Sequence, residues 1–295
     1  MSDTVKITID GKEYDVDAGS NLVDAAKWHA GNDIPVFCYH PKMDPVGMCR
    51  MCLVEMGSEV RDRATGDLVL NDDGTPQIRW FPKLQTACTT TATNGLHIKT
   101  NTEQVTEARK DVLEFLLTSH PLDCPICDKG GECPLQNLTM RHGPESSRMY
   151  AEDKIHLEKH YPLGDLIFLD RERCIQCARC IRFQDEIVGD DVLAFHERGR
   201  ALQIITNSDP GFDTYFSGNT TDICPVGALT TADFRFGARP WELNEVPSIS
   251  PWDAAGENIS LSMRLDRDFD GKAMIKRVMP RQNEWVNEIW ISDKT

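Results

Sequence analysis

The segment 120–133 places one imidazole and three thiols within fourteen residues. Thiolate is a soft metal ligand and imidazole a borderline one, and Gly130 and Gly131 allow the backbone to fold back between the ligands. The spacing of x3, x2 and x5 therefore predicts a loop that closes around one metal ion or one iron–sulfur cube. Its potential ligands are His120, Cys124, Cys127 and Cys133.

A second group of cysteines precedes this loop, in a C-x10-C-x2-C…C pattern. Plant-type ferredoxins bind a [2Fe–2S] cluster with C-x4-C-x2-C…C, so the first loop is longer here. Structural zinc also favours four cysteines and is the alternative at this site. His40 lies beside the first cysteine, but four thiols already complete either kind of site. The predicted ligands are Cys38, Cys49, Cys52 and Cys88.

A third group follows the loop, as C-x2-C-x2-C with a remote Cys-Pro. This pattern is typical of a [4Fe–4S] cluster, in which three close thiols and one distant thiol bind the four corners. Two-cluster ferredoxins carry a further cysteine at the place where this chain has Gln184, so we predict one cluster. Its ligands are Cys174, Cys177, Cys180 and Cys224. With His120, the three groups use all eleven cysteines and form twelve ligands for three clusters.

Composition narrows the class of protein. Eleven cysteines is an odd number, which argues against a closed disulfide framework. The N-terminus has no basic stretch followed by an apolar one, so we expect the reducing cytosol. No apolar run reaches the roughly 18 residues that span a bilayer, so membrane association would come only through partners. A net charge of −15 argues against nucleic acid as a partner.

The motifs predict electron transfer without a substrate site. Fully ligated iron–sulfur centres have no open coordination position, so they move single electrons. The phosphate-binding patterns G-x-G-x-x-G and G-x-x-x-x-G-K-[ST] are absent from the sequence. We therefore expect no catalytic residues and no binding residues for NADH, FMN or quinone in this chain.

The elements that would position the first group are a hairpin and a helix. Alternation over 5–16 with Asp10-Gly11 at the turn predicts a β-hairpin. Ser20 is expected to cap a short helix that Gly31 ends. Hairpin then helix indicates a ubiquitin-like β-grasp. One face of this helix is expected to contain Leu22, Ala25, Ala26 and His29, and His29 is interpreted as a face residue and not as a ligand.

Further elements lead into the other two groups. A period of 3.6 over 103–119 predicts a helix that feeds directly into His120. The gap between Cys52 and Cys88 is expected to form an exposed hairpin insertion. The remaining predictions are strands at 166–169, 192–196 and 202–206 and a helix at 181–188. The apolar side of the helix predicted over 103–119 would contain Val105, Ala108, Val112, Phe115 and Leu116.

Four motifs together resemble the large iron–sulfur subunit of respiratory complex I, over nearly the whole chain. The histidine-ligated loop is the most specific of them. The others are Ile34-Pro-Val-Phe-Cys-Tyr-His40, Cys49-Arg-Met-Cys-Leu-Val-Glu55 and Cys224-Pro-Val-Gly-Ala-Leu229.

The resemblance implies an α+β multidomain chain with one [2Fe–2S] and two [4Fe–4S] clusters. It assigns the binuclear cluster to Cys38, Cys49, Cys52 and Cys88, one cube to His120, Cys124, Cys127 and Cys133, and the other to Cys174, Cys177, Cys180 and Cys224. The implied domains are a β-grasp [2Fe–2S] ferredoxin-type domain (1–100), a short helical [4Fe–4S] domain with one histidine and three cysteine ligands (101–143), a ferredoxin-like [4Fe–4S] domain (144–238) and the beginning of a molybdopterin-oxidoreductase-like domain (239–295).

The resemblance also implies a place in an enzyme. In this family electrons leave NADH through FMN on a neighbouring subunit and pass along the clusters towards quinone, while proton pumping takes place in distant membrane subunits. The expected partners are the NADH/FMN subunit and other peripheral-arm subunits. The expected location is the cytoplasmic face of the bacterial plasma membrane, without direct insertion.

The chain departs from the family pattern in two respects. Some bacterial members carry four more cysteines for an extra cube, whereas this chain has none after Cys224, so that cube is expected to be absent. The chain also stops at Thr295, which indicates either a fragment or a shortened subunit. Diaphorase subunits of NAD-linked hydrogenases and formate dehydrogenases resemble the same module and are the alternative function. A zinc-stabilised scaffold is the alternative from another class.

Overall fold

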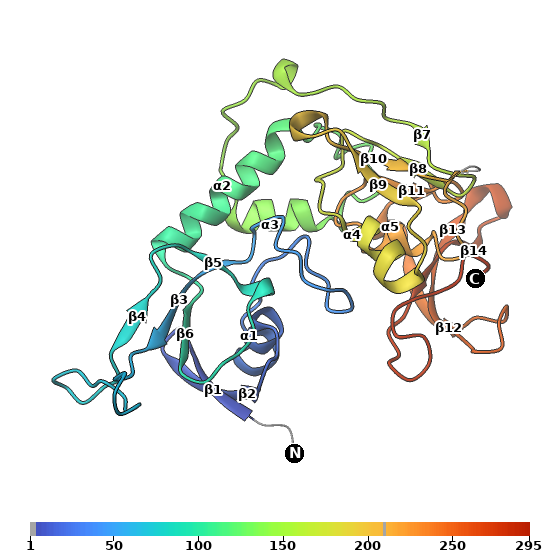
Figure 1. Ribbon diagram of the computed structural model, residues 1–295. Coiled ribbons are helices and arrows are strands. Elements are labelled where there is room, and N and C mark those ends of the chain that lie inside the picture. Colours follow the sequence, from blue (N-terminus) through green and yellow to red (C-terminus); the bar gives the residue numbers. More distant parts are fainter. Residues whose placement is uncertain (1–3, 209–210) are drawn as a thin grey trace. The chain divides into compact units, whose positions relative to one another are not determined.

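The computed structural model describes residues 4–208 and 211–295 (Figure 1). The chain forms two compact units. Unit 1 comprises Met1–Phe115 and Leu138–Ser146, and unit 2 comprises Leu116–Asn137 and Ser147–Thr295. Each unit has sheets of its own, so each can hold its ligand loops on its own framework.

Unit 1 is built on a six-stranded mixed sheet of order β2-β1-β6-β3-β4, with β5 paired to β3. Strand β1 is antiparallel to β2 and parallel to β6. The elements are β1 (Thr4–Ile9), β2 (Lys12–Asp17), α1 (Leu22–Ala30), β3 (Leu53–Glu59), β4 (Ile78–Trp80), β5 (Gln85–Thr86) and β6 (Leu96–Lys99), followed by α2 (Glu103–Ser119) and α3 (Pro134–His142), which each run from one unit into the other.

The predicted hairpin and β-grasp are confirmed. Asp10 and Gly11 both have positive φ, 48° and 83°, as a two-residue turn between twisted strands requires. The Asp10 carboxylate accepts hydrogen bonds from the backbone N–H and hydroxyl of Thr100 at 2.7 and 2.6 Å, which ties the turn to the end of β6. Buried side chains of α1 join those of β1, β2, β3 and β6 in one hydrophobic core.

The boundaries of α1 correct one prediction. Gly31 ends the helix in the left-handed region, as expected, but the N-cap is Asn21 and not Ser20. The Asn21 side chain accepts the Val23 N–H at 2.9 Å and also donates to the carbonyl of Cys88. This second contact favours Asn21 over Ser20, because it fastens the cap to the rest of the unit. His29, in the last turn of α1, is exposed, whereas Leu22, Ala25 and Ala26 are buried.

Helix α2 has the predicted bounds, but its buried stripe differs from the expected one. Val105, Arg109 and Leu113 are its buried residues, whereas Phe115 is 76% exposed. Arg109 is long enough to reach into the sheet, where Nη2 donates to the carbonyl of Leu53 at 3.4 Å. A charged side chain thus occupies the stripe that hydrophobic periodicity assigned to apolar residues.

The segment between β3 and β4 is exposed, as predicted for an insertion. Two isolated bridges, Arg61 with Leu68 and Leu70 with Pro76, hold it together. The Asn71 carbonyl accepts the Gly74 N–H at 2.9 Å and closes a turn within this segment.

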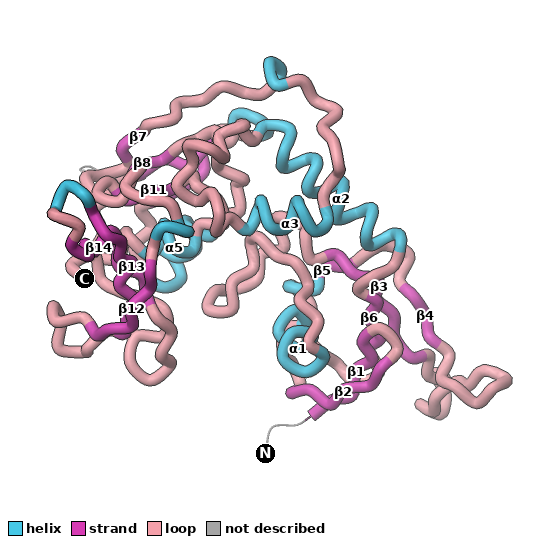
Figure 2. The backbone as a smooth tube through the Cα atoms, turned by 180° about the vertical axis from the view of Figure 1, so that it is seen from behind, coloured by secondary structure: helices cyan, strands magenta, loops and turns pink. Residues whose placement is uncertain are grey.

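In its described residues, unit 2 contains three small antiparallel sheets, whose strands are drawn in magenta in Figure 2. Their orders are β11-β8-β7, β10-β9 and β12-β13-β14. The elements are β7 (Tyr161–Pro162), β8 (Ile167–Leu169), α4 (Arg179–Arg182), a π-helical turn (Phe183–Val188), β9 (Leu193–His196), β10 (Gln203–Thr206), α5 (Asn219–Ile223), β11 (Leu229–Thr231), β12 (Asn244–Ile249), β13 (Asn258–Asp266) and β14 (Lys272–Pro280). The strands predicted at 166–169, 192–196 and 202–206 and the helical segment at 181–188 are therefore confirmed.

Candidate metal centres

The four cysteines of unit 1 are brought together by the β-grasp. The loop after α1 carries Cys38, the turn before β3 carries Cys49 and Cys52, and the short helical turn Ala87–Thr89 carries Cys88. The backbone N–H of Cys38 donates to the Cys49 sulfur at 3.4 Å, and the Cys49 N–H donates to the Cys38 sulfur at 3.5 Å. The sulfur of Cys88 is hydrogen-bonded to those of Cys38 and Cys52. Residues far apart in sequence thus form one thiol cluster.

Hydrogen bonds between these thiols shift their pKa values in opposite directions. Hydrogen bonds from the side chains of Cys49 and Cys88 lower the pKa of Cys38 to about 2. The same hydrogen bond to Cys38, together with burial, raises the pKa of Cys49 well above its usual value. Crowded buried thiols can all ionise only beside a compensating positive charge, and thiolate is the form that binds metal. This donor set fits an iron–sulfur cluster.

The middle set lies on a loop held by its own backbone. The carbonyl of Asp123 accepts the N–H groups of Ile126 and Cys127, at 2.9 and 2.8 Å. Cys133 precedes α3, and its sulfur accepts hydrogen bonds from the N–H groups of Leu135 and Gln136. A helix N-terminus favours the thiolate. In this set Cys127 and Cys133 are buried and Cys124 is exposed.

His120 has the environment of a neutral ligand. Burial, reinforced by the positive charges of Lys154 and Arg173, lowers its pKa to about 4. Its Nδ1 is buried and has no hydrogen-bond partner among the described residues. A buried ring nitrogen is normally hydrogen-bonded or bound to a metal. The unpaired nitrogen therefore fits the predicted ligand role.

The third set lines a small apolar cavity of about 20 Å³. Its walls include Leu169, Ile204 and Val226, and the cysteines at its edge are Cys174, Cys177, Cys180 and Cys224. Burial raises the pKa of Cys174 and of Cys180 above that of a free thiol. Neutral thiols can be buried in the wall of this apolar cavity. The burial of charged thiolates there requires a compensating positive charge, which a metal would supply.

The Cys-x2-Cys turns that open the first and third sets share a backbone feature. A residue between the two cysteines adopts the left-handed region: Arg50 (φ 60°) in unit 1 and Gln176 (φ 57°) in unit 2. Ala178, between Cys177 and Cys180, does the same with φ 61°. Left-handed conformations of residues other than glycine are uncommon and concentrate at functional sites.

The middle and third sets share a border within unit 2. The Cys133 sulfur lies 3.7 Å from the carbonyl oxygen of Pro225, the residue that follows Cys224. Among the described residues, no three His, Cys, Asp or Glu side chains are arranged to hold one metal ion. A cluster contains several iron atoms: each ligand of a [4Fe–4S] cube binds its own iron, and four thiolates share the two irons of a [2Fe–2S] cluster, so the ligands of one set need not converge on a single ion.

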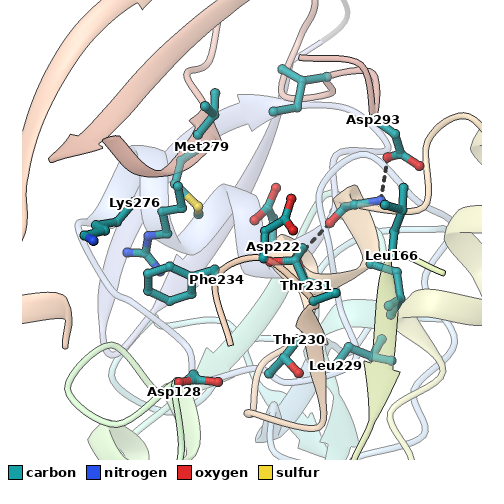
Figure 3. Close-up of a pocket in the computed structure, with 18 of the residues that line it drawn as sticks. Asp128, Leu166, Asp222, Leu229, Thr230, Thr231, Phe234, Lys276, Met279 and Asp293 are labelled. Carbon is teal, nitrogen blue, oxygen red and sulfur yellow. Dashed lines mark hydrogen bonds between the residues drawn. The ribbon is translucent and has the colours of Figure 1, made fainter. Parts of the chain in front are cut away.

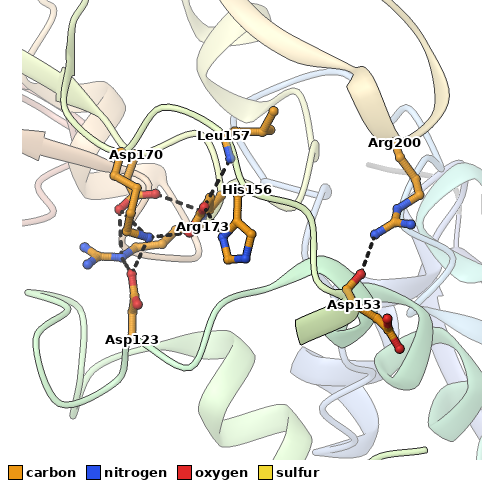
Figure 4. Close-up of polar contacts among 9 residues, drawn as sticks. Asp123, Asp153, His156, Leu157, Asp170, Arg173 and Arg200 are labelled. Carbon is orange, nitrogen blue, oxygen red and sulfur yellow. Dashed lines mark hydrogen bonds and ion pairs between the residues drawn. The ribbon is translucent and has the colours of Figure 1, made fainter. Parts of the chain in front are cut away.

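Sequence reasoning missed a group of charged residues beside these loops. Three carboxylates, two of them buried, surround a lysine and an arginine (Figure 4). The residues are Asp123, Lys159, Asp170, Glu172 and Arg173. Three of them adjoin or nearly adjoin predicted ligands in sequence, which is the only signal that the sequence offered.

Unit 2 also contains a larger cavity of about 560 Å³. Asp222, Thr231 and Phe234 are among the side chains that line it (Figure 3). Burial raises the pKa of Asp222 to about 7, so this carboxyl is partly protonated near neutral pH. No helix within residues 4–208 or 211–295 is long and apolar enough to cross a membrane.

Comparisons with known proteins match iron–sulfur domains to the parts of the chain that contain the three sets. Residues 2–103 match the family model described as a 2Fe-2S iron-sulfur cluster binding domain. Residues 109–148 match the NADH-ubiquinone oxidoreductase-G iron-sulfur binding region, and residues 164–230 match the ferredoxin-like domain of NADH-quinone oxidoreductase subunit 3. Subunit 3 from Thermus thermophilus is 40% identical over 98% of this chain and 37% of its own length.

The chain belongs to the family of large iron–sulfur subunits of NADH-quinone oxidoreductase. The family member from Streptomyces coelicolor is 42% identical over 99% of the chain and 31% of its own length, and the mitochondrial 78 kDa subunit of Neurospora crassa is 41% identical over 99% and 35%. The chain thus spans about a third of the length of the curated relatives it matches. It contains a [2Fe–2S] ferredoxin-like domain followed by [4Fe–4S] domains.

The C-terminal segment matches a different description from the one expected. Residues 243–295 match the NDSU1/NuoG-like 4Fe-4S domain of NADH-ubiquinone oxidoreductase. The start of a molybdopterin-oxidoreductase-like domain is not confirmed and stays a prediction. Because this chain has no cysteine after Cys224, the matched segment contains no thiol for a further cluster.

One solved structure also resembles the chain. It is a chain in the crystal structure of the NAD+-reducing [NiFe]-hydrogenase in the H2-reduced state, with a TM-score of 0.62 and 28% identity. The likeness covers 79% of this chain and 90% of that one.

Proposed function

We propose that this chain carries single electrons through one [2Fe–2S] and two [4Fe–4S] clusters, as the N-terminal iron–sulfur part of an NADH:quinone oxidoreductase. The observation that carries the proposal is the buried, unpartnered Nδ1 of His120 on the loop that also bears three cysteines. A neutral imidazole whose buried Nδ1 has no hydrogen-bond partner among the described residues is suited to metal ligation.

Each set would hold one cluster. The binuclear cluster would be bound by Cys38, Cys49, Cys52 and Cys88, the first cube by His120, Cys124, Cys127 and Cys133, and the second cube by Cys174, Cys177, Cys180 and Cys224. The clusters would supply the redox chemistry, and the protein would orient the thiolates and exclude water around most of them. The border at Pro225 would bring the two cubes close enough for electrons to pass between them.

The proposal extends to partners and location. The relatives are subunits of NADH-quinone oxidoreductases, so an NADH/FMN-binding subunit would supply electrons and other peripheral-arm subunits would receive them towards quinone. Proton translocation would take place elsewhere in that complex. We place the chain on the cytoplasmic face of the bacterial plasma membrane, held there by its partners.

A second candidate function is that of a diaphorase subunit in an NAD-linked hydrogenase or formate dehydrogenase. It is favoured by the resemblance to 90% of a chain in the NAD+-reducing hydrogenase structure. Purification of the tagged chain from its host separates the two functions. Membrane subunits and quinone reductase activity support the first, and a hydrogenase or formate dehydrogenase partner overturns it.

Metal analysis of anaerobically prepared protein tests the cluster content. We expect about ten irons per chain, equimolar sulfide and no zinc. Electron paramagnetic resonance (EPR) of the reduced sample should then contain one binuclear and two cubane signals. Zinc in place of iron, in protein never exposed to oxygen, would make the chain a structural scaffold.

A further inference from the structure

A compact group of ion pairs lies between the predicted ligand loops of the two cubes in unit 2 (Figure 4). We name it the loop clamp. The side chains of Arg173, Asp170 and Glu172 are only 3%, 4% and 6% exposed. Its members are Asp123, Lys159, Asp170, Glu172 and Arg173.

The central contact of the loop clamp joins Asp123 to Arg173. The Arg173 Nε donates to the Asp123 Oδ2 at 2.9 Å. Asp123 immediately precedes Cys124 of the middle set, and Arg173 immediately precedes Cys174 of the third set. One hydrogen-bonded ion pair therefore fastens the loop of one predicted cube to the loop of the other.

Both residues are also fixed to their own loops. The Asp123 carbonyl accepts the N–H of Cys127 at 2.8 Å, so movement of Asp123 would displace a predicted ligand. The backbone N–H of Arg173 donates to the Asp170 Oδ1 at 3.3 Å, and its Nε lies 3.1 Å from the Asp170 Oδ2. The pair is therefore rigid on both sides.

Lys159 completes the loop clamp from a third segment. Its Nζ lies 2.6 Å from the carboxylates of Asp123 and Glu172 and 3.4 Å from that of Asp170. Glu172 also accepts the N–H of Leu157 at 3.1 Å. The ionised loop clamp thus has three carboxylates and two cations, so loss of the Arg173 charge leaves an additional uncompensated negative charge beside both loops.

Arg173 also acts on the thiols electrostatically. Burial raises the pKa of the Cys127 thiol, a predicted ligand of the other loop, and the positive charge of Arg173 opposes this rise. A charge in a buried, low-dielectric place interacts strongly with its surroundings. A cluster becomes more negative by one charge when it accepts an electron, so a nearby buried cation stabilises its reduced form and raises its potential.

We propose that Asp123 and Arg173 are positioning residues that set the separation of the two cubes and the reduction potential of the cube on the 120–133 loop. This inference rests on the proposed function. Arg173 stabilises the reduced cube and Asp123 opposes it, while their ion pair holds the two loops at one distance. Neither residue binds iron.

The test measures potentials in the assembled complex, purified anaerobically with its partner subunits. Arg173→Gln removes a positive charge and is expected to shift the midpoint potential of the middle cube downwards. Asp123→Asn removes a negative charge, keeps an oxygen that can accept from Arg173, and is expected to shift the same potential upwards. Arg173→Lys should restore most of the original value.

A neighbouring ion pair supplies the matched control. The guanidinium of Arg171 pairs with Glu158 at 2.7 Å and does not contact Asp123. Arg171→Gln removes the same kind of charge two residues away, and it should leave the potential of the middle cube unchanged. EPR power saturation of both cubes reports their separation, and it should change in Arg173→Gln but not in Arg171→Gln.

The outcomes decide between the inference and the proposed function. Opposite shifts of the midpoint potential in Arg173→Gln and Asp123→Asn support the inference. Structural damage alone would not make the direction of the shift follow the sign of the charge that was removed. Unchanged or equally directed shifts overturn it while the clusters remain. If Arg173→Gln contains no cubes, the test depends on Asp123→Asn, in which an upward shift of the midpoint potential supports the inference. If Asp123→Asn also loses its cubes, the two residues serve folding only and the inference is overturned. Absence of cubane signals from the unaltered protein overturns the proposed function itself.

Discussion

The sulfur of Cys127 lies directly against Gly227: a Cβ on that glycine would stand 2.1 Å from the thiol. Gly227 follows Cys224 by three residues, so this contact joins the predicted ligand loops of both cubes. Real Cβ atoms do not approach other atoms this closely. Any residue larger than glycine at this position must therefore push the two loops apart.

Gly227→Ala is expected to disturb both cubes and spare the binuclear cluster. Overpacking of a tight site costs about 1–3 kcal/mol, and here the strain falls on a ligand. EPR of the reduced protein should record weakened or broadened cubane signals. Gly189→Ala is the control, because no atom lies within 4 Å of its Cβ and only its φ of 75° adds strain. Equal spectra for the two variants would contradict this prediction.

His120→Cys should keep a cube in place and lower its potential. The change replaces a neutral ligand by a thiolate, which makes the cluster more negative by one charge. A redox titration followed by EPR measures the shift. His142→Gln, at the end of α3 and outside every ligand set, should leave the spectrum as it is. An unchanged spectrum in His120→Cys would mean that His120 is not a ligand.

Cys224→Ala and Cys88→Ala should remove different signals. Cys224 lies at the cavity of Cys174, Cys177 and Cys180, whereas Cys88 bonds to Cys38 and Cys52 in unit 1. The first variant should lose the second cube and keep the binuclear signal, and the second should do the reverse. Loss of the binuclear signal in Cys224→Ala would show that the grouping of ligands is wrong.

Asn21→Ala should destabilise unit 1 more than Ser20→Ala does. Asn21 caps α1 and also holds the carbonyl of Cys88, so its loss removes two hydrogen bonds. Loss of a cap residue costs about 0.5–2 kcal/mol. Thermal unfolding followed by loss of the binuclear cluster's absorbance compares the variants. A larger loss of thermal stability in Ser20→Ala than in Asn21→Ala would show that Ser20 is the cap.

The exposed insertion should be dispensable for cluster binding. Val60 and Gln77 face each other across its base, where the Val60 N–H donates to the Gln77 carbonyl at 2.8 Å. Replacing residues 61–76 with Asn-Gly would close the strands by a two-residue turn. Iron content and the binuclear EPR signal should stay unchanged. If either falls, the insertion supports the Cys52–Cys88 region directly.

Local signals in the sequence predicted most of the elements. Asp10-Gly11, Gly31 and the 3.6 period of 103–119 each act within a few residues, and the structure follows them. The errors arose where tertiary contacts decide. Asn21 replaces Ser20 as cap because of its contact with Cys88, and Arg109 belongs to the buried stripe of α2 whereas Phe115 is exposed.

For the candidate sites too, local patterns could be predicted from the sequence and contacts between distant residues could not. Cysteine spacing predicted three groups, and each Cys-x2-Cys turn shows why close thiols can act together. The Asp123–Arg173 pair was missed because it joins residues 50 positions apart, and no local pattern specifies such a pairing. The contact of Gly227 with Cys127 was missed for the same reason. The sequence contains twenty glycines and does not indicate which of them lies too close to another residue to accept a Cβ.

The order of the ligands along the chain has a consequence for biogenesis. Ribosomal synthesis completes the thiol cluster of unit 1 as soon as Cys88 has been added, and N-terminal domains fold first. The middle loop is complete at Cys133, yet the Pro225 and Gly227 surface that borders it comes much later, together with Cys224. Cluster-loading machinery would thus meet one finished site early, and two further sites that mature at the same moment.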